Sequence, residues 1–151
     1  MNLKVQDVLA LFDEVFAKLG QRMLLDNSEF TIDNQLPADF YLKFNSVAKP
    51  GRVNMNFEVT SSNVTFWIDK TREMPDFSYE MIREDPARFK DAIEMIFSST
   101  IHAEYKGNRA ILSFINNDNI LVGKYRFHLG ILPNWCSRKF TKIYDSYFEF
   151  C

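Results

Sequence analysis

Two histidines and a glutamate lie in a spacing that could hold a metal ion. His102 and Glu104 are two residues apart, so on a β-strand both side chains would point to the same face. His128 could join them from a neighbouring strand, and imidazole with carboxylate is a common ligand set for zinc and related metals. A working site also needs converging ligands with supporting hydrogen bonds, and the sequence indicates none. We therefore expect two surface histidines on an open sheet, without a metal ion or a cofactor.

A second set of residues is typical of magnesium-dependent nucleases. Pro75-Asp76 followed by Glu104-x-Lys106 resembles the Pro-Asp…Glu-x-Lys pattern of a large nuclease family. In that family the paired acids hold the metal and the lysine positions the attacking water. The resemblance implies a metal-dependent nuclease. The alternative function is therefore a metal-dependent hydrolase or nuclease that uses Asp76, Glu104 and Lys106, to which we add His102.

A thiol and an imidazole are the remaining catalytic possibility. Cys136 could act as a nucleophile with His128 as its base, but the sequence shows no third group and no loop for an oxyanion hole. It also contains no Gly-x-Ser-x-Gly elbow and no glycine-rich phosphate loop. We expect Cys136 to be a structural residue and the chain to have no catalytic residues.

Composition and charge indicate one domain, spanning 1–151. The 151 residues include 15 Phe and 6 Tyr, so the core or an interface must be built largely from rings. The formal net charge of −2 argues against general nucleic-acid binding, which depends on an excess of Lys and Arg. Residues 1–39 hold seven acids against three bases, whereas residues 101–144 hold seven bases against two acids. We expect a dipolar molecule if these segments lie apart.

The cysteines and the apolar segments favour the cytoplasm. The two cysteines, Cys136 and Cys151, both lie near the C-terminus and do not form the spaced framework of a secreted scaffold. Lys4 and Asp7 interrupt the apolar residues of the N-terminal segment, which is unlike a signal peptide. No apolar run approaches the length of a membrane span. We expect free thiols in a cytoplasmic protein that does not associate with membranes.

Hydrophobic spacing predicts the elements that must position these residues. Apolar residues recur at intervals of three and four where we expect helices, and they alternate with polar residues where we expect strands. Asp85-Pro86 is typical of a helix start, with the aspartate as N-cap and proline at the first helical position. The predicted elements are a helix over 5–19, strands over 40–45, 53–59 and 64–69, a helix over 86–98, strands over 101–105, 110–114 and 121–127, and a C-terminal helix over 138–149.

Two segments between these elements are less regular. Residues 70–85 are charged and contain Pro75, so we expect a loop with one helical turn near 79–83. Residues 30–32 could form a short strand. The predicted fold class is α+β, with an N-terminal helix, two antiparallel three-strand meanders separated by a helix, a C-terminal helix, and helices mainly on one face of the sheet.

The outward residues of the strands are typical of a binding face. Exposed aromatic side chains among charged and amide groups are the composition of protein interfaces. The predicted partner-binding residues are Tyr41, Glu58, Trp67, Glu104, Arg126 and His128.

Two resemblances agree with a binding function. Leu36-Pro37-Ala38-Asp39-Phe40, with the residues up to Phe44, resembles the Leu-Pro-x-Asp-Tyr opening of the SUKH superfamily of bacterial immunity proteins. The expected order of helices and meanders looks like that of type III secretion chaperones, which bind effector segments as dimers. We expect a non-enzymatic protein-binding module of the immunity or antitoxin type, with a toxin domain as the partner. A chaperone-like effector binder, with a possible homodimer, is the other alternative.

Overall fold

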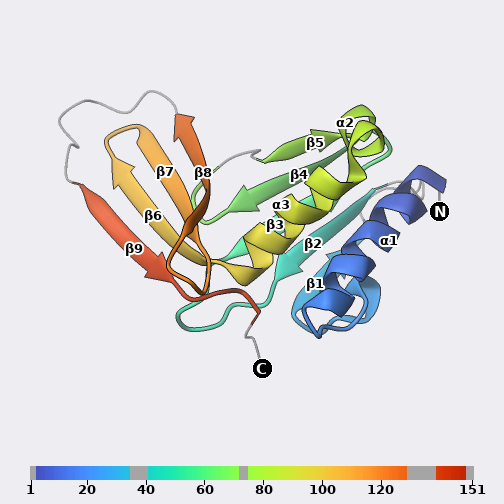
Figure 1. Cartoon of the computed structure of the whole chain (residues 1–151), viewed down its shortest axis with the longest axis horizontal. Helices are drawn as coiled ribbons and strands as arrows, with labels where there is room; N and C mark the ends of the chain where they lie inside the picture. The colour runs from blue at the N-terminus through green and yellow to red at the C-terminus, as the bar shows by residue number, and fades with distance from the viewer. Residues whose placement is uncertain (1–2, 35–40, 72–74, 129–138, 149–151) are drawn as a thin grey trace.

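The computed structural model describes residues 3–34, 41–71, 75–128 and 139–148, which form two antiparallel β-sheets and three α-helices (Figure 1). This α+β architecture is the predicted fold class. The elements in chain order are α1 (Leu3–Lys18), a 3₁₀ turn η1 (Leu24–Asp26), β1 (Phe30–Asp33), β2 (Leu42–Ser46), β3 (Met55–Val59), β4 (Asn63–Ile68), β5 (Asp76–Ser78), α2 (Tyr79–Glu84), α3 (Pro86–Ser98), β6 (Thr100–Lys106), β7 (Arg109–Ile115), β8 (Leu121–His128) and β9 (Phe140–Tyr144).

The first sheet is a five-stranded antiparallel meander in the order β1-β2-β3-β4-β5. Strands β2, β3 and β4 are the predicted first meander, and β1 is the short strand expected at residues 30–32. Alternation of side chains buries Phe44, Phe57 and Phe66 on one face, as the period of two predicts. The expected loop at 70–85 is wrong in part, because Asp76–Ser78 pairs with the otherwise free edge of β4 as β5.

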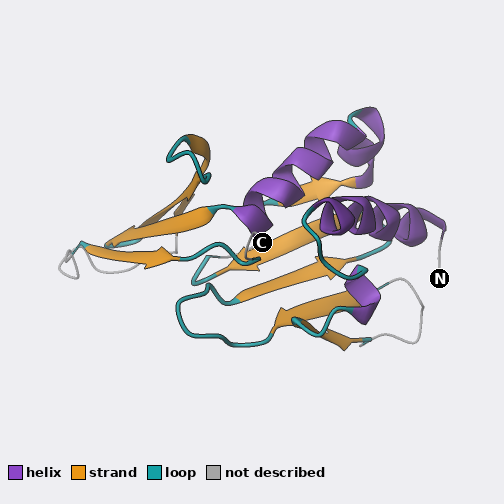
Figure 2. Cartoon of the chain, turned by 60° about the horizontal axis from the view of Figure 1, so that its bottom comes forward, coloured by secondary structure: helices purple, strands orange, loops and turns teal. Residues whose placement is uncertain are grey.

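Helices α1 and α3 lie side by side on the buried face of the first sheet (Figure 2). Asp85 accepts a hydrogen bond from the backbone N–H of Arg88 at 3.0 Å and Pro86 follows it, which is the predicted start of α3. Gly20, with a φ of 71°, adopts the left-handed conformation directly beyond α1. No helix in the described ranges is long and apolar enough to cross a membrane.

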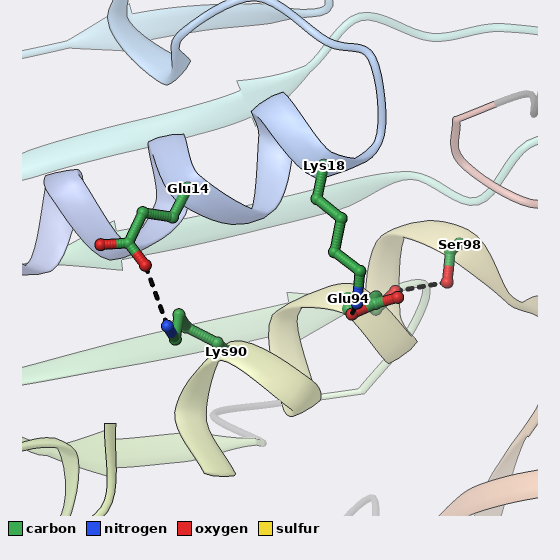
Figure 3. Close-up of polar contacts among 5 residues, drawn as sticks. All are labelled: Glu14, Lys18, Lys90, Glu94 and Ser98. Carbon is green, nitrogen blue, oxygen red and sulfur yellow. Dashed lines mark hydrogen bonds and ion pairs between the residues drawn. The ribbon is translucent and has the colours of Figure 1, made fainter. Parts of the chain in front are cut away.

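Two ion pairs join the exposed sides of α1 and α3 (Figure 3). Lys90 Nζ lies 2.9 Å from a carboxylate oxygen of Glu14, and Lys18 Nζ lies 2.6 Å from one of Glu94. The partners are four residues apart on each helix, so the two helices run parallel. Burial against the sheet provides most of the stability here, because exposed ion pairs contribute little.

The core between these helices and the first sheet is built from aromatic rings. Phe57 stacks on Phe44 at a centroid distance of 4.7 Å and on Phe12 of α1 at 5.2 Å. The C-terminal segment enters the same core, where Tyr147 stacks on Phe30 at 5.4 Å. The high phenylalanine content is therefore used mainly inside the molecule.

The second sheet has the strand order β8-β7-β6-β9 and lies beyond one end of the first sheet (Figure 1). Its strands β6, β7 and β8 are the predicted second meander. The inner face is buried at Ile101, Ala103 and Leu112. Strand β8 also packs directly on α3. The approach is so close at Gly123 that a Cβ atom on this residue would lie 2.1 Å from Sδ of Met95 in α3. The second sheet thus covers the end of the helical layer.

The predicted C-terminal helix over 138–149 is wrong. Residues Phe140–Tyr144 form β9, which pairs antiparallel with β6 from Ile101 opposite Tyr144 to Tyr105 opposite Phe140. The spacing of Phe140, Ile143 and Tyr144 fits a helix, but aromatic and β-branched residues also suit a strand. The hydrogen-bonding groups on the free edge of β6 decide in favour of the strand.

The acidic and basic segments lie apart in space. Helix α1 and β1 belong to the acidic N-terminal segment, whereas β6 to β9 belong to the basic segment, and Figure 1 shows them at opposite ends of the molecule. The described residues therefore form a dipolar molecule, as the charge distribution predicts.

Candidate functional site

The open face of the first sheet, opposite the helices, carries polar side chains in register. One row across β2, β3, β4 and β5 contains Lys43, Glu58, Thr65 and Asp76, each opposite the next. In the neighbouring row, Trp67 of β4 lies opposite Asn56 of β3, which lies opposite Asn45 of β2. Strand pairing thus fixes these side chains on one surface, and no helix of the described residues covers it (Figure 2).

Three hollows, of about 270, 440 and 630 Å³, follow one another along this surface and share lining residues; we call this row of hollows the trough. Glu58 and Trp67 line both the first and the second hollow, and Asp69 and Lys70 line both the second and the third. The trough runs, in order, past Asp76, Glu58, Trp67, Asp69, Lys70 and Lys142. Its size suits several side chains of an extended polypeptide.

The first end of the trough is acidic. Asp76 is exposed and accepts hydrogen bonds from the Thr65 hydroxyl at 2.7 Å and from Asn63 Nδ2 at 3.0 Å. Glu58 accepts a hydrogen bond from Tyr41. The pKa of Tyr41 is raised to about 12, chiefly by burial of its hydroxyl and secondly by this hydrogen bond. The Tyr41 hydroxyl is protonated near neutral pH, as an ordinary tyrosine is, and donates this hydrogen bond to Glu58.

Trp67 occupies the middle of the trough and is half-buried. It is the one tryptophan among the described residues, and it lies opposite Asn56 of β3. A large amphipathic ring that remains accessible among polar groups is the usual anchor of a protein interface.

The second end of the trough is built on Asp69, which follows β4. The Tyr144 hydroxyl donates a hydrogen bond to Asp69 Oδ1 at 2.9 Å, and the Tyr105 hydroxyl donates another to Oδ2. Asp69 has a φ of 55°, a left-handed conformation that aspartate tolerates better than most residues. These bonds join the two sheets, because both tyrosines belong to the second sheet.

The two tyrosines make the junction sensitive to high pH. Burial, aided by the Asp69 carboxylate, raises the pKa of Tyr105 and raises that of Tyr144 to about 12. An unfolded tyrosine titrates near 10, so their stabilisation is complete below about pH 10 and is lost as the pH rises towards about 12. We expect the free energy of unfolding to fall over this range, and to fall less steeply in Tyr144→Phe. Urea unfolding between about pH 9 and about pH 12 measures both slopes, and equal slopes would contradict the assignment.

The predicted partner-binding residues divide between two surfaces. Glu58 and Trp67 line the trough, and Tyr41 donates a hydrogen bond to Glu58. The other three, Glu104, Arg126 and His128, lie on the outer face of the second sheet, where Ile111 separates Glu104 from Arg126. The structure therefore does not bring the six residues together, because the two meanders form separate sheets.

The possible metal ligands are also apart. The row that contains His102 reaches β8 at Lys124, whereas His128 lies four residues further along that strand, about 13 Å at 3.3 Å per residue. Glu104 forms an ion pair with Lys139 at 3.3 Å. In the part of the chain that the structure describes, no three potential metal ligands converge.

The nuclease-like residues lie on different sheets. Asp76 is on β5 of the first sheet, and Glu104 and Lys106 are on β6 of the second. Strand pairing gives Asp76 and Glu104 different neighbours, so the described contacts do not place them around one metal ion. Cys136 and the residues 36–40 of the immunity-protein resemblance lie outside the described residues.

Asp69, Lys70 and Lys142 are the trough residues that sequence reasoning missed. Lys142 lies in the segment predicted to be a helix, and Asp69-Lys70 is an ordinary strand end in the sequence. A turn-forming aspartate directly after a strand is a local signal for a tight bend, but not for contact with distant tyrosines.

Another hollow, of about 540 Å³, lies between α1 and α2 and is more apolar. Val8, Leu11 and Ile82 line it together with charged residues of both signs. These charges do not form a region of one sign, and the described residues do not show what would cover the groove.

The trough can therefore hold a polypeptide segment through an aromatic anchor and charges of opposite sign at its two ends. Its described residues offer hydrogen-bond donors and acceptors and charges of both signs. Comparison with known protein families, curated proteins and solved structures finds no match to this chain.

Proposed function

We propose that this chain is a cytoplasmic, non-enzymatic protein-binding module whose trough takes a segment of a partner protein. The observation that carries this proposal is the accessible Trp67 at the centre of a trough with Glu58 beside it and lysines beyond it. Interface anchors of this kind dominate binding energy when polar neighbours exclude water around them. The charges at either end would set the direction of the bound segment.

We further propose that binding inhibits the partner, as an immunity protein inhibits a toxin domain. Two observations support this step. The residues 36–40 that resemble the immunity superfamily directly precede Tyr41, which donates a hydrogen bond to Glu58 of the trough. The separation of acidic and basic regions favours fast, steered association with a charged partner. General binding to nucleic acid is not part of this proposal.

Affinity capture from the native host tests the proposal. Tagged wild-type chain, Trp67→Ala and Ile143→Ala serve as parallel baits in moderate salt. Ile143 is a matched control, because it is a large apolar residue with 62% exposure on the outer face of the second sheet. We expect one stoichiometric protein on the wild-type and Ile143→Ala baits and at least tenfold less on Trp67→Ala. Equal recovery on all three, or no recovery, would contradict trough binding.

The captured partner then separates inhibitor from chaperone. If the partner's own activity falls as one equivalent of chain is added, the immunity proposal is supported. An unchanged activity would contradict inhibition and favour the chaperone-like alternative, which also predicts a homodimer by light scattering.

A further inference from the structure

The basic end of the trough contains two lysines that project from different sheets. Lys70 follows β4, and Lys142 belongs to β9. Both line the third hollow together with Lys49 and Arg52. Lys49 and Arg52 already have partners within the chain. Lys49 forms an ion pair with Glu29 at 2.5 Å, and Arg52 donates a hydrogen bond to the backbone carbonyl of Tyr147 at 2.8 Å.

Lys70 and Lys142 converge on one aromatic ring. Their Nζ atoms lie 5.7 and 5.5 Å from the centroid of Phe140, which is 44% exposed. Cation–π contact orients an ammonium group but leaves its N–H donors available to a ligand. Within the described residues, no ion pair joins either lysine to a carboxylate.

The neighbouring aspartate does not neutralise these lysines through an ion pair. Asp69 instead accepts hydrogen bonds from Tyr105 and Tyr144 with its two carboxylate oxygens. Those bonds hold β9, and therefore Lys142, against the turn that carries Lys70. The backbone segments that carry the two lysines are thus held together by contacts made elsewhere, and both side chains line one hollow, which lowers the entropic cost of binding an anion there.

The charge pattern decides between the anions that could bind. A nucleic acid would need cations along much of its path, but beyond Lys70 the trough presents the carboxylates of Glu58 and Asp76, with Lys43 opposite Glu58. A short group of carboxylates on a polypeptide needs only the local pair, and the Phe140 ring offers apolar contact to the side-chain methylenes.

We propose that Lys70 and Lys142 bind an acidic stretch of the partner, two or more adjacent carboxylates, with Phe140 as the apolar platform. This inference rests on the proposed function and sets the polarity of the bound segment. Its acidic residues lie at the junction of the sheets, and its remaining length extends past Trp67 towards Asp76.

The test uses a capped tetraglutamate peptide as the probe, titrated into the isotope-labelled full chain in low salt and followed by NMR. We expect saturable shifts of the backbone amides of residues 69–71 and 141–144. Lys70→Gln/Lys142→Gln should weaken the apparent dissociation constant at least fivefold. The matched variant Lys106→Gln/Lys124→Gln removes the same charge from exposed positions outside the trough and should bind within twofold of wild type.

Three results would overturn the inference: no saturable shifts in those segments, equal weakening by both double variants, or tighter binding of a thymidine tetranucleotide at the same residues. The partner complex separates this failure from failure of the proposed function. If tetraglutamate does not bind but Trp67→Ala still abolishes capture, the trough function stands and the acidic-stretch inference is wrong. If tetraglutamate binds while Trp67→Ala captures the partner normally, the anion site stands and the Trp67 interface is wrong.

Discussion

Phe57→Ala will lower the free energy of unfolding by about 4 kcal/mol, the cost typical of removing a fully buried phenylalanine. Phe57 is 0% exposed and stacks on Phe44 at 4.7 Å, on Phe12 at 5.2 Å and on Phe66 at 5.2 Å. Its ring therefore joins α1 to three strands of the first sheet. Its loss removes ring contacts and leaves a cavity that rigid neighbours cannot fill.

Urea unfolding followed by circular dichroism measures this effect. Phe140→Ala is the control, because its ring is partly exposed on the edge strand β9, and we expect it to cost about 1 kcal/mol or less. A Phe57→Ala protein within about 1 kcal/mol of wild type, at an unchanged dependence on urea, would contradict the central place of this ring in the core.

Asp69→Ala should lower the free energy of unfolding by about 3 kcal/mol, the second largest effect. The substitution removes the acceptor of the Tyr105 and Tyr144 hydroxyls, and because both hydrogen bonds are only partly buried we expect each to contribute about 1 kcal/mol. It also places alanine at a φ of 55°, which costs about 1 kcal/mol in the left-handed region.

Two further substitutions separate these causes. Asp69→Gly relieves the backbone strain but loses both hydrogen bonds, so it should be more stable than Asp69→Ala. Asp69→Asn tolerates the left-handed conformation and keeps one acceptor oxygen, so it should be the mildest of the three. Tyr144→Phe combined with Asp69→Ala should be less destabilising than the sum of the single changes. Strict additivity would mean that the observed hydrogen bond contributes nothing to the junction of the sheets.

Local sequence patterns predict those parts of the fold that depend on interactions between residues close in sequence. The alternation through Phe57 and Phe66 has one buried face, so a shift by one residue would expose the whole set, and the strands follow. The Asp85-Pro86 signal predicts the start of α3 because the Asp85 side chain accepts a hydrogen bond from the backbone N–H of Arg88, three residues away in the first turn of the same helix. Where an element depends on a distant partner, the pattern is ambiguous. Residues 140–144 fit either a helix or a strand, and β6 decides between them.

The residues of the trough divide in the same way, into those that local patterns predict and those that distant contacts position. Glu58 and Trp67 are predicted as outward residues, and hairpins of neighbouring strands bring them together. Lys142 reaches Lys70 only because β9 pairs with β6 and two tyrosines reach Asp69, and none of these contacts is local in sequence. The sequence predicts one binding face for the outward residues of both meanders, because local patterns do not show that the strands form two sheets.

The dissociation constant of the purified partner complex tests the central claim most directly. It is measured by titration calorimetry with wild-type chain, Trp67→Ala and Ile143→Ala, each first shown to be folded by its melting curve. We predict that Trp67→Ala weakens binding by about 30-fold or more, equivalent to about 2 kcal/mol for an anchor residue, while Ile143→Ala stays within about twofold of wild type. A folded Trp67→Ala that binds within about threefold of wild type would contradict the trough as the partner-binding surface.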